Sequence, residues 1–287
     1  MLIPIADVPR WYAERRSEDM IAISHGEETL TWRQLERNAN RRARAFAAKG
    51  VKSGDFVAIG LRNGNEFFET TFAVWKCGAT PTSLSWRLPR GEAAAVLEIL
   101  RPSLVVGGET DWNAGNSLPA GFLPEGFSDE PLTNPVSRYW KAMTSGGSTG
   151  RPKVIVDHQP AVIDTAVEQP LGIAPGTTLL NPGPLYHNAP FSVTHLALFG
   201  GGRITGMVKF DAEETLRLIA RDRVQWVNFV PTMMHRIWTL PGEVRDAYDL
   251  SKPEDRIPHG STDAAVAEGK LDCVARPRAN LRTLWRH

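Results

Sequence analysis

The chain has 287 residues, and its 33 basic and 32 acidic side chains give a formal net charge of +1. This balance excludes the strong basic bias that is typical of nucleic-acid-binding and membrane-surface proteins. The start of the chain has no basic leader with a small-residue cleavage site, and the long uncharged run after Glu168 is interrupted by Pro and Gly. We therefore expect a cytoplasmic globular protein with no membrane span, and its length allows a large core.

The first third of the chain predicts alternating helices and strands. Thr31 can cap a helix in which Leu35, Ala39, Ala43 and Phe46 recur at three- or four-residue spacing. A tight turn at 54–55 is expected before a strand that ends at residue 59. A helix over 67–75, ended by Gly78, a helix over 92–100 and a strand over 104–106 should follow. This rhythm predicts α/β layering with parallel strands. Residues 107–138 predict a loop.

Residues 143–153 are the most informative stretch, and they read M-T-S-G-G-S-T-G-R-P-K. The segment looks too irregular for a helix or a strand, and consecutive backbone N–H groups in such a glycine-rich turn form an anion-binding concavity. Lys153 adds a positive charge, and the apolar run at 154–156 predicts a strand directly after it. A flexible Gly/Ser linker is the alternative. The segment is not a Walker motif, because Gly146 and Gly150 are too close together and Pro152 precedes the lysine.

The middle of the chain continues the α/β pattern. Gly200 and the two glycines after it predict the end of an apolar helix that leads into a strand. Asp211 and Glu214 predict a capping box, and residues 224–231 predict another strand. His158 and His195 have no partners at metal-ligand spacing, and the two cysteines predict no disulfide framework, so we expect no metal site.

Four segments resemble the adenylate-forming superfamily, which includes acyl-CoA synthetases, luciferases and peptide-synthetase adenylation domains. Residues 144–153, T-S-G-G-S-T-G-R-P-K, resemble its phosphate loop T-S-G-[ST]-T-G-x-P-K with one additional residue, a variant most similar to bile-acid-CoA-ligase-type enzymes. The segments L-T-W-R-Q-L at 30–35, V-K-S-G-D-F-V-A-I at 51–59 and L-L-N-P-G-P-L-Y-H-N at 179–188 resemble its other core motifs. The resemblance covers most of the chain.

The resemblance implies an α/β fold of layered, parallel-rich sheets flanked by helices. Residues 1–250 would form an incomplete N-terminal AMP-binding domain, with the small C-terminal lid absent. His187 would lie beside the reacting carboxylate, while Asn228, Thr232, Tyr186 and Phe191 are weaker candidates for the wall of the acyl pocket. The phosphate-binding residues that the resemblance implies are Thr144, Ser145, Gly146, Gly147, Ser148, Thr149, Gly150 and Lys153.

The activity implied by the resemblance is that of an ATP-dependent acid–CoA ligase, in keeping with fatty acid metabolism. A carboxylic acid would be activated as acyl-AMP and transferred to coenzyme A, with Mg²⁺ shielding the phosphates. The superfamily's Y-G-x-T-E motif and the lid lysine have no match, so we expect this truncated chain to be inactive or nearly so. A non-catalytic nucleotide- or acyl-binding fragment, a luciferase-like enzyme and a peptide-synthetase domain are the alternatives.

Residues 251–287 do not continue the α/β rhythm. They show no helical or strand period and few large apolar residues before Leu284 and Trp285. One interpretation is a disordered tail. The sharper hypothesis is translation out of frame, because suitable synonymous codons, reread in a shifted frame, yield a sequence that resembles the superfamily's continuation up to Y-G-G-T-E.

Overall fold

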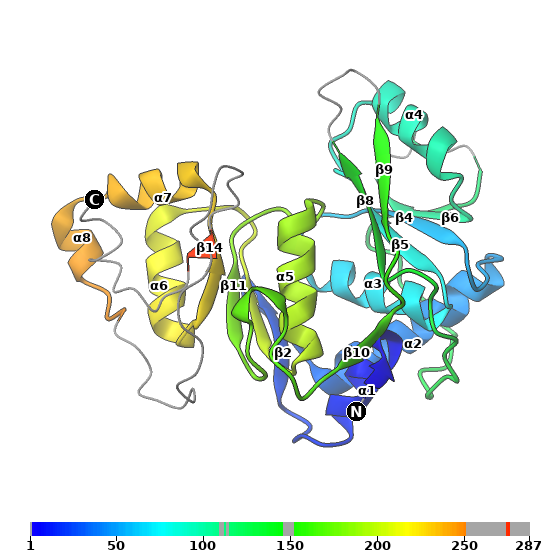
Figure 1. Cartoon of the computed structure of the whole chain (residues 1–287), viewed down its shortest axis with the longest axis horizontal. Coiled ribbons are helices and arrows are strands. Elements are labelled where there is room, and N and C mark those ends of the chain that lie inside the picture. Colours follow the sequence, from blue (N-terminus) through cyan, green and yellow to red (C-terminus); the bar gives the residue numbers. More distant parts are fainter. Residues whose placement is uncertain (1, 109–111, 113–114, 146–151, 251–273, 276–287) are drawn as a thin grey trace.

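A computed structural model of the chain describes residues 2–108, 112, 115–145, 152–250 and 274–275. Within these ranges the chain forms two six-stranded sheets with helices between and outside them (Figure 1). The α/β fold of layered, parallel-rich sheets flanked by helices is therefore confirmed. No helix in the described ranges is long and apolar enough to cross a bilayer.

The first sheet, called the β4 sheet below, is parallel except for one edge strand. Its strands are, in spatial order, β7 (Ser117–Leu118), β6 (Leu104–Gly107), β4 (Phe56–Gly60), β5 (Thr80–Ser83), β8 (Lys141–Ser145) and β9 (Lys153–Asp157). Only β9 runs antiparallel to its neighbour. Strands β4 and β6 are continuous apolar runs, as expected where both faces of a sheet are covered, whereas β5 is buried but reads T-P-T-S.

The second sheet, called the β11 sheet, has a parallel centre and antiparallel edges. Its strands are, in spatial order, β14 (Val274–Ala275), β13 (Trp226–Asn228), β11 (Thr178–Asn181), β12 (Arg203–Gly206), β2 (Ile21–His25) and β3 (Glu28–Thr31). A separate two-stranded sheet pairs β1 (Leu2–Pro4) with β10 (Val162–Asp164). Near it lie the short helices η1 (Ile5–Asp7) and α1 (Val8–Ala13).

Two helices lie between the large sheets, and this explains why most of their residues are buried. Helix α3 (Asn65–Lys76) contacts strands of both sheets, and ten of its twelve residues are buried. Helix α5 (Asn188–Phe199) packs on β11, β12 and β13, and its aromatic side chains also reach Trp140 beside β8. Figure 1 shows both helices in the middle of the molecule.

The remaining helices are amphipathic and cover outer faces. Helix α2 (Trp32–Ala48) packs on α1 and α3, and Thr31 and Gln34 form a reciprocal capping box at its start. Helix α4 (Arg90–Leu100) packs against the outer face of the β4 sheet through Val96 and Leu100. The β11 sheet is covered by α6 (Ala212–Asp222) and α7 (Pro231–Trp238), with α8 (Gly242–Asp246) beside α6. The α2, α4 and α6 predictions and the C′ position of Gly78, with φ of 71°, are confirmed.

Three local predictions need correction. The stretch from Met143 is not wholly irregular, because the strand β8 continues to Ser145 and β9 begins at Lys153. The strand predicted over 224–231 is limited to β13, since Pro231 begins α7, where its missing N–H has no cost. The loop predicted over 107–138 contains the short strand β7, which pairs in parallel with β6 at the edge of the β4 sheet.

Two further corrections concern a cap and the tail. Only half of the capping box forms at α6: Asp211 accepts a hydrogen bond from the Glu214 N–H, while the Glu214 carboxylate pairs with Arg217 at 2.5 Å. In the tail, Val274 and Ala275 pair antiparallel with β13, so these two residues depart from the prediction of a segment without strands. Residues 251–273 and 276–287 lie outside the described residues, and the out-of-frame hypothesis stays a prediction.

Candidate functional site

Three of the predicted phosphate-binding residues, Thr144, Ser145 and Lys153, lie in the paired strands of a β-hairpin. Strands β8 and β9 pair in register, with Thr144 opposite Val154 and Ser145 opposite Lys153. The pairing brings Ser145 and Lys153 together, although eight positions separate them in the sequence, and the Lys153 side chain is exposed. The predicted residues Gly146, Gly147, Ser148, Thr149 and Gly150 lie outside the described residues.

The end of β8 lies at the carboxyl edge of the β4 sheet. Strand β8 runs parallel to β5, and the Thr144 hydroxyl donates to the Ser83 carbonyl at 3.5 Å, where β5 ends. Ligands of open α/β sheets bind outside the carboxyl ends of the strands. The hairpin therefore carries the Thr144 hydroxyl and Lys153 to the edge where binding is expected.

His187 lies at the start of α5, in the turn that follows β11. It is the N-cap residue of the helix, with φ of −85° and ψ of 147°, and its side chain makes no cap hydrogen bond. The ring lies 4.5 Å from the Tyr186 ring, measured between centroids, and is exposed. Partial desolvation by neighbouring groups lowers the pKa of His187 below its usual value, so the ring is neutral at pH 7.

Lys141, at the start of β8, ties the hairpin to α5. Its ammonium donates to the Asn188 side-chain oxygen at 2.5 Å and to the Ser192 hydroxyl at 2.8 Å. The preceding residue, Trp140, packs near Phe191 and Phe199. The step from Trp140 to Lys141 therefore leads towards the N-terminus of α5, and the start of β8 lies beside the turn that carries His187.

Lys141 is held without a close counter-ion. It is 7% exposed, and the nearest carboxylate oxygen, on Asp157, is 3.9 Å away. Desolvation by burial lowers the pKa of Lys141, and the charge of Asp157 opposes this shift. Two neutral oxygens thus provide the close hydrogen bonds to a buried ammonium, an arrangement that fixes the helix relative to the strand.

Asn63 connects the turn after β4 to the loop that carries His187. Its amide nitrogen donates to the Gly183 carbonyl at 2.9 Å, and its amide oxygen accepts from the Leu185 N–H at 2.9 Å. Asn181 also donates to the Gly183 carbonyl, at 2.9 Å. The loop before α5 is therefore fixed to the carboxyl edges of both sheets, and His187 projects from a well-supported turn.

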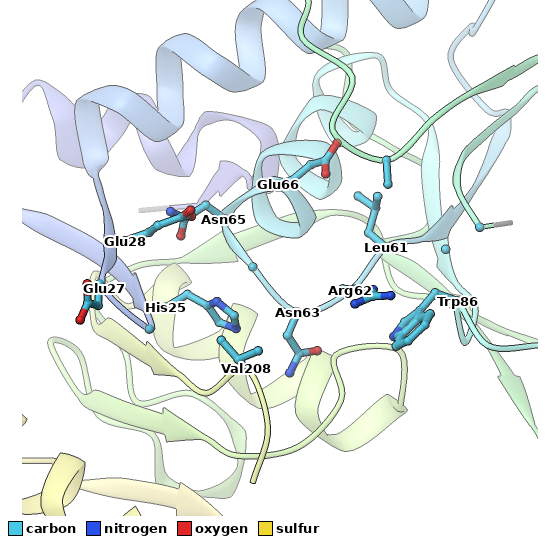
Figure 2. A pocket seen from close by; sticks show the side chains of 15 residues that line it. His25, Glu27, Glu28, Leu61, Arg62, Asn63, Asn65, Glu66, Trp86 and Val208 are labelled. Carbon is cyan, nitrogen blue, oxygen red and sulfur yellow. The ribbon is translucent and has the colours of Figure 1, made fainter. Parts of the chain in front are cut away.

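A cavity of about 840 Å³ opens beside this turn. Figure 2 shows its walls, which come from the ends of β2, β4, β5, β6 and β12. Its side chains include His25, Arg62, Asn63, Trp86 and Val208. A cavity of this size at the carboxyl ends of parallel strands is suited to a small-molecule ligand.

Sequence reasoning missed Lys141, Asn63 and the cavity side chains. Lys141 carries a local signal, because it is a lysine at the start of a strand that continues with Ala142 and Met143. Asn63 offers only the turn sequence Asn-Gly-Asn. The cavity residues come from five separate strand ends, so their meeting depends on topology that no local pattern encodes.

The weaker candidates for the wall of the acyl pocket differ in how far they are buried. Phe191 is fully buried among the rings of Phe67, Trp75 and His195, so its visible role is packing. Asn228 is 6% exposed on β13, while Thr232 is exposed on the first turn of α7. The described residues contain no group of three or more His, Cys, Asp or Glu side chains that could hold a metal ion.

Comparison with known proteins bears directly on this arrangement. A family model described as "AMP-binding enzyme" matches residues 10–133 and 141–270. The chain belongs to the AMP-binding enzyme family. The second matched segment includes both strands of the hairpin and His187, and it extends into the tail after residue 250.

Relatives in this family include CoA synthases and CoA ligases. The chain is 32% identical over 241 residues to a feruloyl-CoA synthase from Amycolatopsis sp., which covers 79% of this chain and 49% of the relative. It is 27% identical to a 2-succinylbenzoate–CoA ligase from Geobacillus kaustophilus, with 83% and 51% covered. The chain therefore spans about half the length of these curated relatives.

A solved structure supports the fold. The inhibitor-bound N-terminal domain of FACL13 from Mycobacterium tuberculosis superimposes with a TM-score of 0.73 at 21% sequence identity, covering 87% of this chain and 67% of that domain. At this identity the likeness shows the fold alone. It agrees with an N-terminal large domain of an adenylate-forming enzyme.

Proposed function

We propose that this chain provides the phosphate-binding part of an ATP-dependent acid–CoA ligase. The observation that carries the proposal is the hairpin, which places Ser145 and Lys153 opposite each other beyond the carboxyl ends of parallel strands. The chain belongs to a family whose relatives include CoA ligases, and Lys141 joins the first strand of the hairpin to the helix that follows His187. The substrates would be a carboxylic acid, ATP and coenzyme A.

The hairpin would hold the β- and γ-phosphates of ATP. The Thr144 and Ser145 hydroxyls and the predicted residues 146–150 would donate hydrogen bonds to phosphate oxygens, and the Lys153 ammonium would offset their charge. An acid carboxylate could then attack the α-phosphorus, forming an acyl–phosphate bond while the bond to pyrophosphate breaks. Binding the leaving pyrophosphate stabilises the charge that develops on it in the transition state.

His187 would position the carboxylate. Because the lowered pKa keeps the imidazole neutral at pH 7, the ring can donate one hydrogen bond to a carboxylate oxygen without a competing ion pair. The contacts of Asn63 and Lys141 hold the loop and the helix on either side of His187. These residues would orient the acid relative to ATP, and orientation accounts for much of the rate of such a transfer.

Mg²⁺ would be supplied with the triphosphate. Ions of this kind in nucleotide sites are held by one or two carboxylates together with substrate phosphates, and they neutralise phosphate charge. The described side chains nearest the tip of the hairpin are the Thr144 hydroxyl and the Lys153 ammonium, and the carboxylate of Asp157 lies at the far end of β9. The donor set fits the phosphates, and it does not by itself fit the metal.

ATP affinity of the 287-residue chain tests the proposal by calorimetry. Lys153→Ala should weaken ATP binding about tenfold to a hundredfold, because a charge-assisted contact contributes about 1.5–3 kcal/mol. Lys52→Ala is the matched control, since this exposed lysine precedes β4 and lies at the amino ends of the parallel strands, away from the hairpin's tip. Equal ATP affinity in wild type and Lys153→Ala would refute the assignment of the hairpin.

Turnover is tested separately with ATP, CoA and a panel of fatty, aromatic and steroid acids. We expect the 287 residues alone to form AMP slowly or not at all, because the part of the chain that matches its relatives covers only 49% and 51% of their length. ATP binding without turnover would agree with this expectation and with a non-catalytic nucleotide-binding fragment. AMP formation at ordinary enzyme rates would contradict it.

A further inference from the structure

The outer side of β9 is an open sheet edge. Strand β9 is the last strand of the β4 sheet, and it pairs only with β8 within the part of the chain that the structure describes. The N–H and C=O groups on its outer side can therefore pair with another strand. Ile155, the middle residue of β9, has a side chain that is 59% exposed. An open edge with an exposed apolar residue is suited to strand addition.

The two faces of β9 carry different side chains. Helix α4 contacts β9 (Figure 1), and Val154 packs into the apolar cluster beneath that helix. Because successive side chains of a strand point to opposite faces, Lys153, Ile155 and Asp157 share the other face. The Lys153 side chain is exposed, and the Asp157 side chain is 34% exposed and accepts a hydrogen bond from the Trp140 indole at 2.6 Å. This face thus carries a cation at one end and an anion at the other.

This order of side chains is complementary to itself. In an antiparallel pair of two copies with a two-fold axis at Ile155, position 153 of each copy lies opposite position 157 of the other. Each Lys153 then faces an Asp157, and the two Ile155 side chains meet at the axis. Cross-strand pairs of opposite charge or of packed apolar residues contribute about 0.2–1 kcal/mol each. An edge lysine hinders pairing with most strands, but in this register an aspartate neutralises it.

Backbone geometry selects the same register. The hydrogen-bonding groups of a strand alternate between its two sides, so two identical strands pair only when outward-facing residues lie opposite outward-facing residues. An axis that passes through a residue meets this condition, whereas an axis between two residues does not. An axis at Val154 would place Lys153 opposite Ile155, and an axis at Val156 would place Asp157 opposite Ile155. The axis at Ile155 uses all five residues of β9 and matches every charge.

We propose that β9 pairs with β9 of a second copy of this chain, so that the two β4 sheets form one continuous sheet across a two-fold axis at Ile155. The interface is isologous, as in most symmetric dimers. The second copy brings its Asp157 beside the Lys153 of the hairpin, and the pairing does not depend on ATP binding there. A five-residue edge is small for a protein–protein interface, so the dimer should dissociate on dilution.

Sedimentation equilibrium of the 287-residue chain without nucleotide, over a range of protein concentrations, tests this interface. Wild type should show a monomer–dimer equilibrium. Ile155→Lys should abolish the dimer, because it places two ammonium groups together at the axis, and its exposed position requires no core space. Leu123→Lys is the matched control, since it adds the same charge at a side chain that is 67% exposed outside β9 and should dimerise like wild type.

Exchange of charges between two variants identifies the register. Lys153→Asp and Asp157→Lys should each be monomeric, because each places like charges opposite each other. An equimolar mixture of the two, with both shown to be folded by circular dichroism, should recover the dimer, since a strand with two aspartates then faces a strand with two lysines. Wild type that stays monomeric at every concentration, a dimer that Ile155→Lys leaves intact, or a mixture of folded variants that stays monomeric would overturn the proposal.

Discussion

His195 provides a quantitative test of the packing between the two sheets. It is fully buried on α5 within an aromatic cluster, with ring-centroid distances of 4.2 Å to Phe191 and 5.3 Å to both Phe68 and Trp75. Its Nδ1 atom lies 2.7 Å from the Phe191 carbonyl, and its Nε2 atom has no hydrogen-bond partner among the residues that the structure describes. Burial is the largest influence and lowers the pKa of His195 to about 3, although the hydrogen bond to Phe191 opposes the shift.

The sign of the pH effect follows from this lowered pKa. Between about pH 6.5 and pH 3 the unfolded chain protonates His195 and the folded chain does not, so acid favours unfolding. At about pH 5 the difference between a pKa near 6.5 unfolded and about 3 folded amounts to roughly 2 kcal/mol, whereas near pH 8 it is close to zero. Lys141 is the charged group that acts on His195, and its positive charge also disfavours protonation.

The assay is urea unfolding of wild type and His195→Phe at about pH 8 and about pH 5. Other groups titrate in both proteins, so the difference between their pH dependences isolates His195. Wild type should lose roughly 2 kcal/mol more than His195→Phe on acidification. The substitution keeps a ring in the cluster and removes the unpartnered nitrogen. Identical losses in the two proteins would refute the neutral buried histidine.

Two further predictions address the core and the tail. Lys76→Met should destabilise the protein by about 3–5 kcal/mol in urea unfolding, because Glu36 would stay buried without the ammonium that now lies 2.9 Å away. The double variant Glu36→Leu/Lys76→Met should recover most of this loss. No recovery in the double variant would contradict a paired buried charge. Sequencing the coding DNA across the Leu250 codon tests the out-of-frame prediction for residues 251–287. Codons that cannot yield the superfamily continuation in a shifted frame would reject it.

The sequence predicts most of the layered architecture because the spacing of apolar residues and the positions of capping residues and glycines are local signals of helices and strands. Thr31 marks the start of α2, Gly78 follows the end of α3, and the apolar runs of β4 and β6 identify strands covered on both faces. The errors of the prediction also arise because only the local sequence is used. The Gly/Ser composition after Met143 hides the strand residues Thr144 and Ser145, because their pairing with β9 is not visible in the local sequence.

The site is less predictable because its residues meet through topology. Motif resemblance identifies Ser145, Lys153 and His187 individually, whereas the contacts that relate them come from residues outside the motifs. Asn63 follows β4, yet it binds the loop after β11, 120 and 122 positions later in the chain. Pairings of this kind depend on strand order, which local propensity does not determine.

Lys141 shows why this supporting contact matters for the reaction. A buried ammonium between two neutral oxygens costs desolvation energy that an apolar side chain would avoid. An apolar residue, however, would let α5 slide along β8, whereas hydrogen bonds at 2.5 Å and 2.8 Å allow one position. Since small displacements of a reacting group greatly reduce the rate of a transfer, fixing the helix that follows His187 would favour catalysis at the expense of stability under the proposed function. In that proposal the lysine is a positioning residue, although no motif contains it.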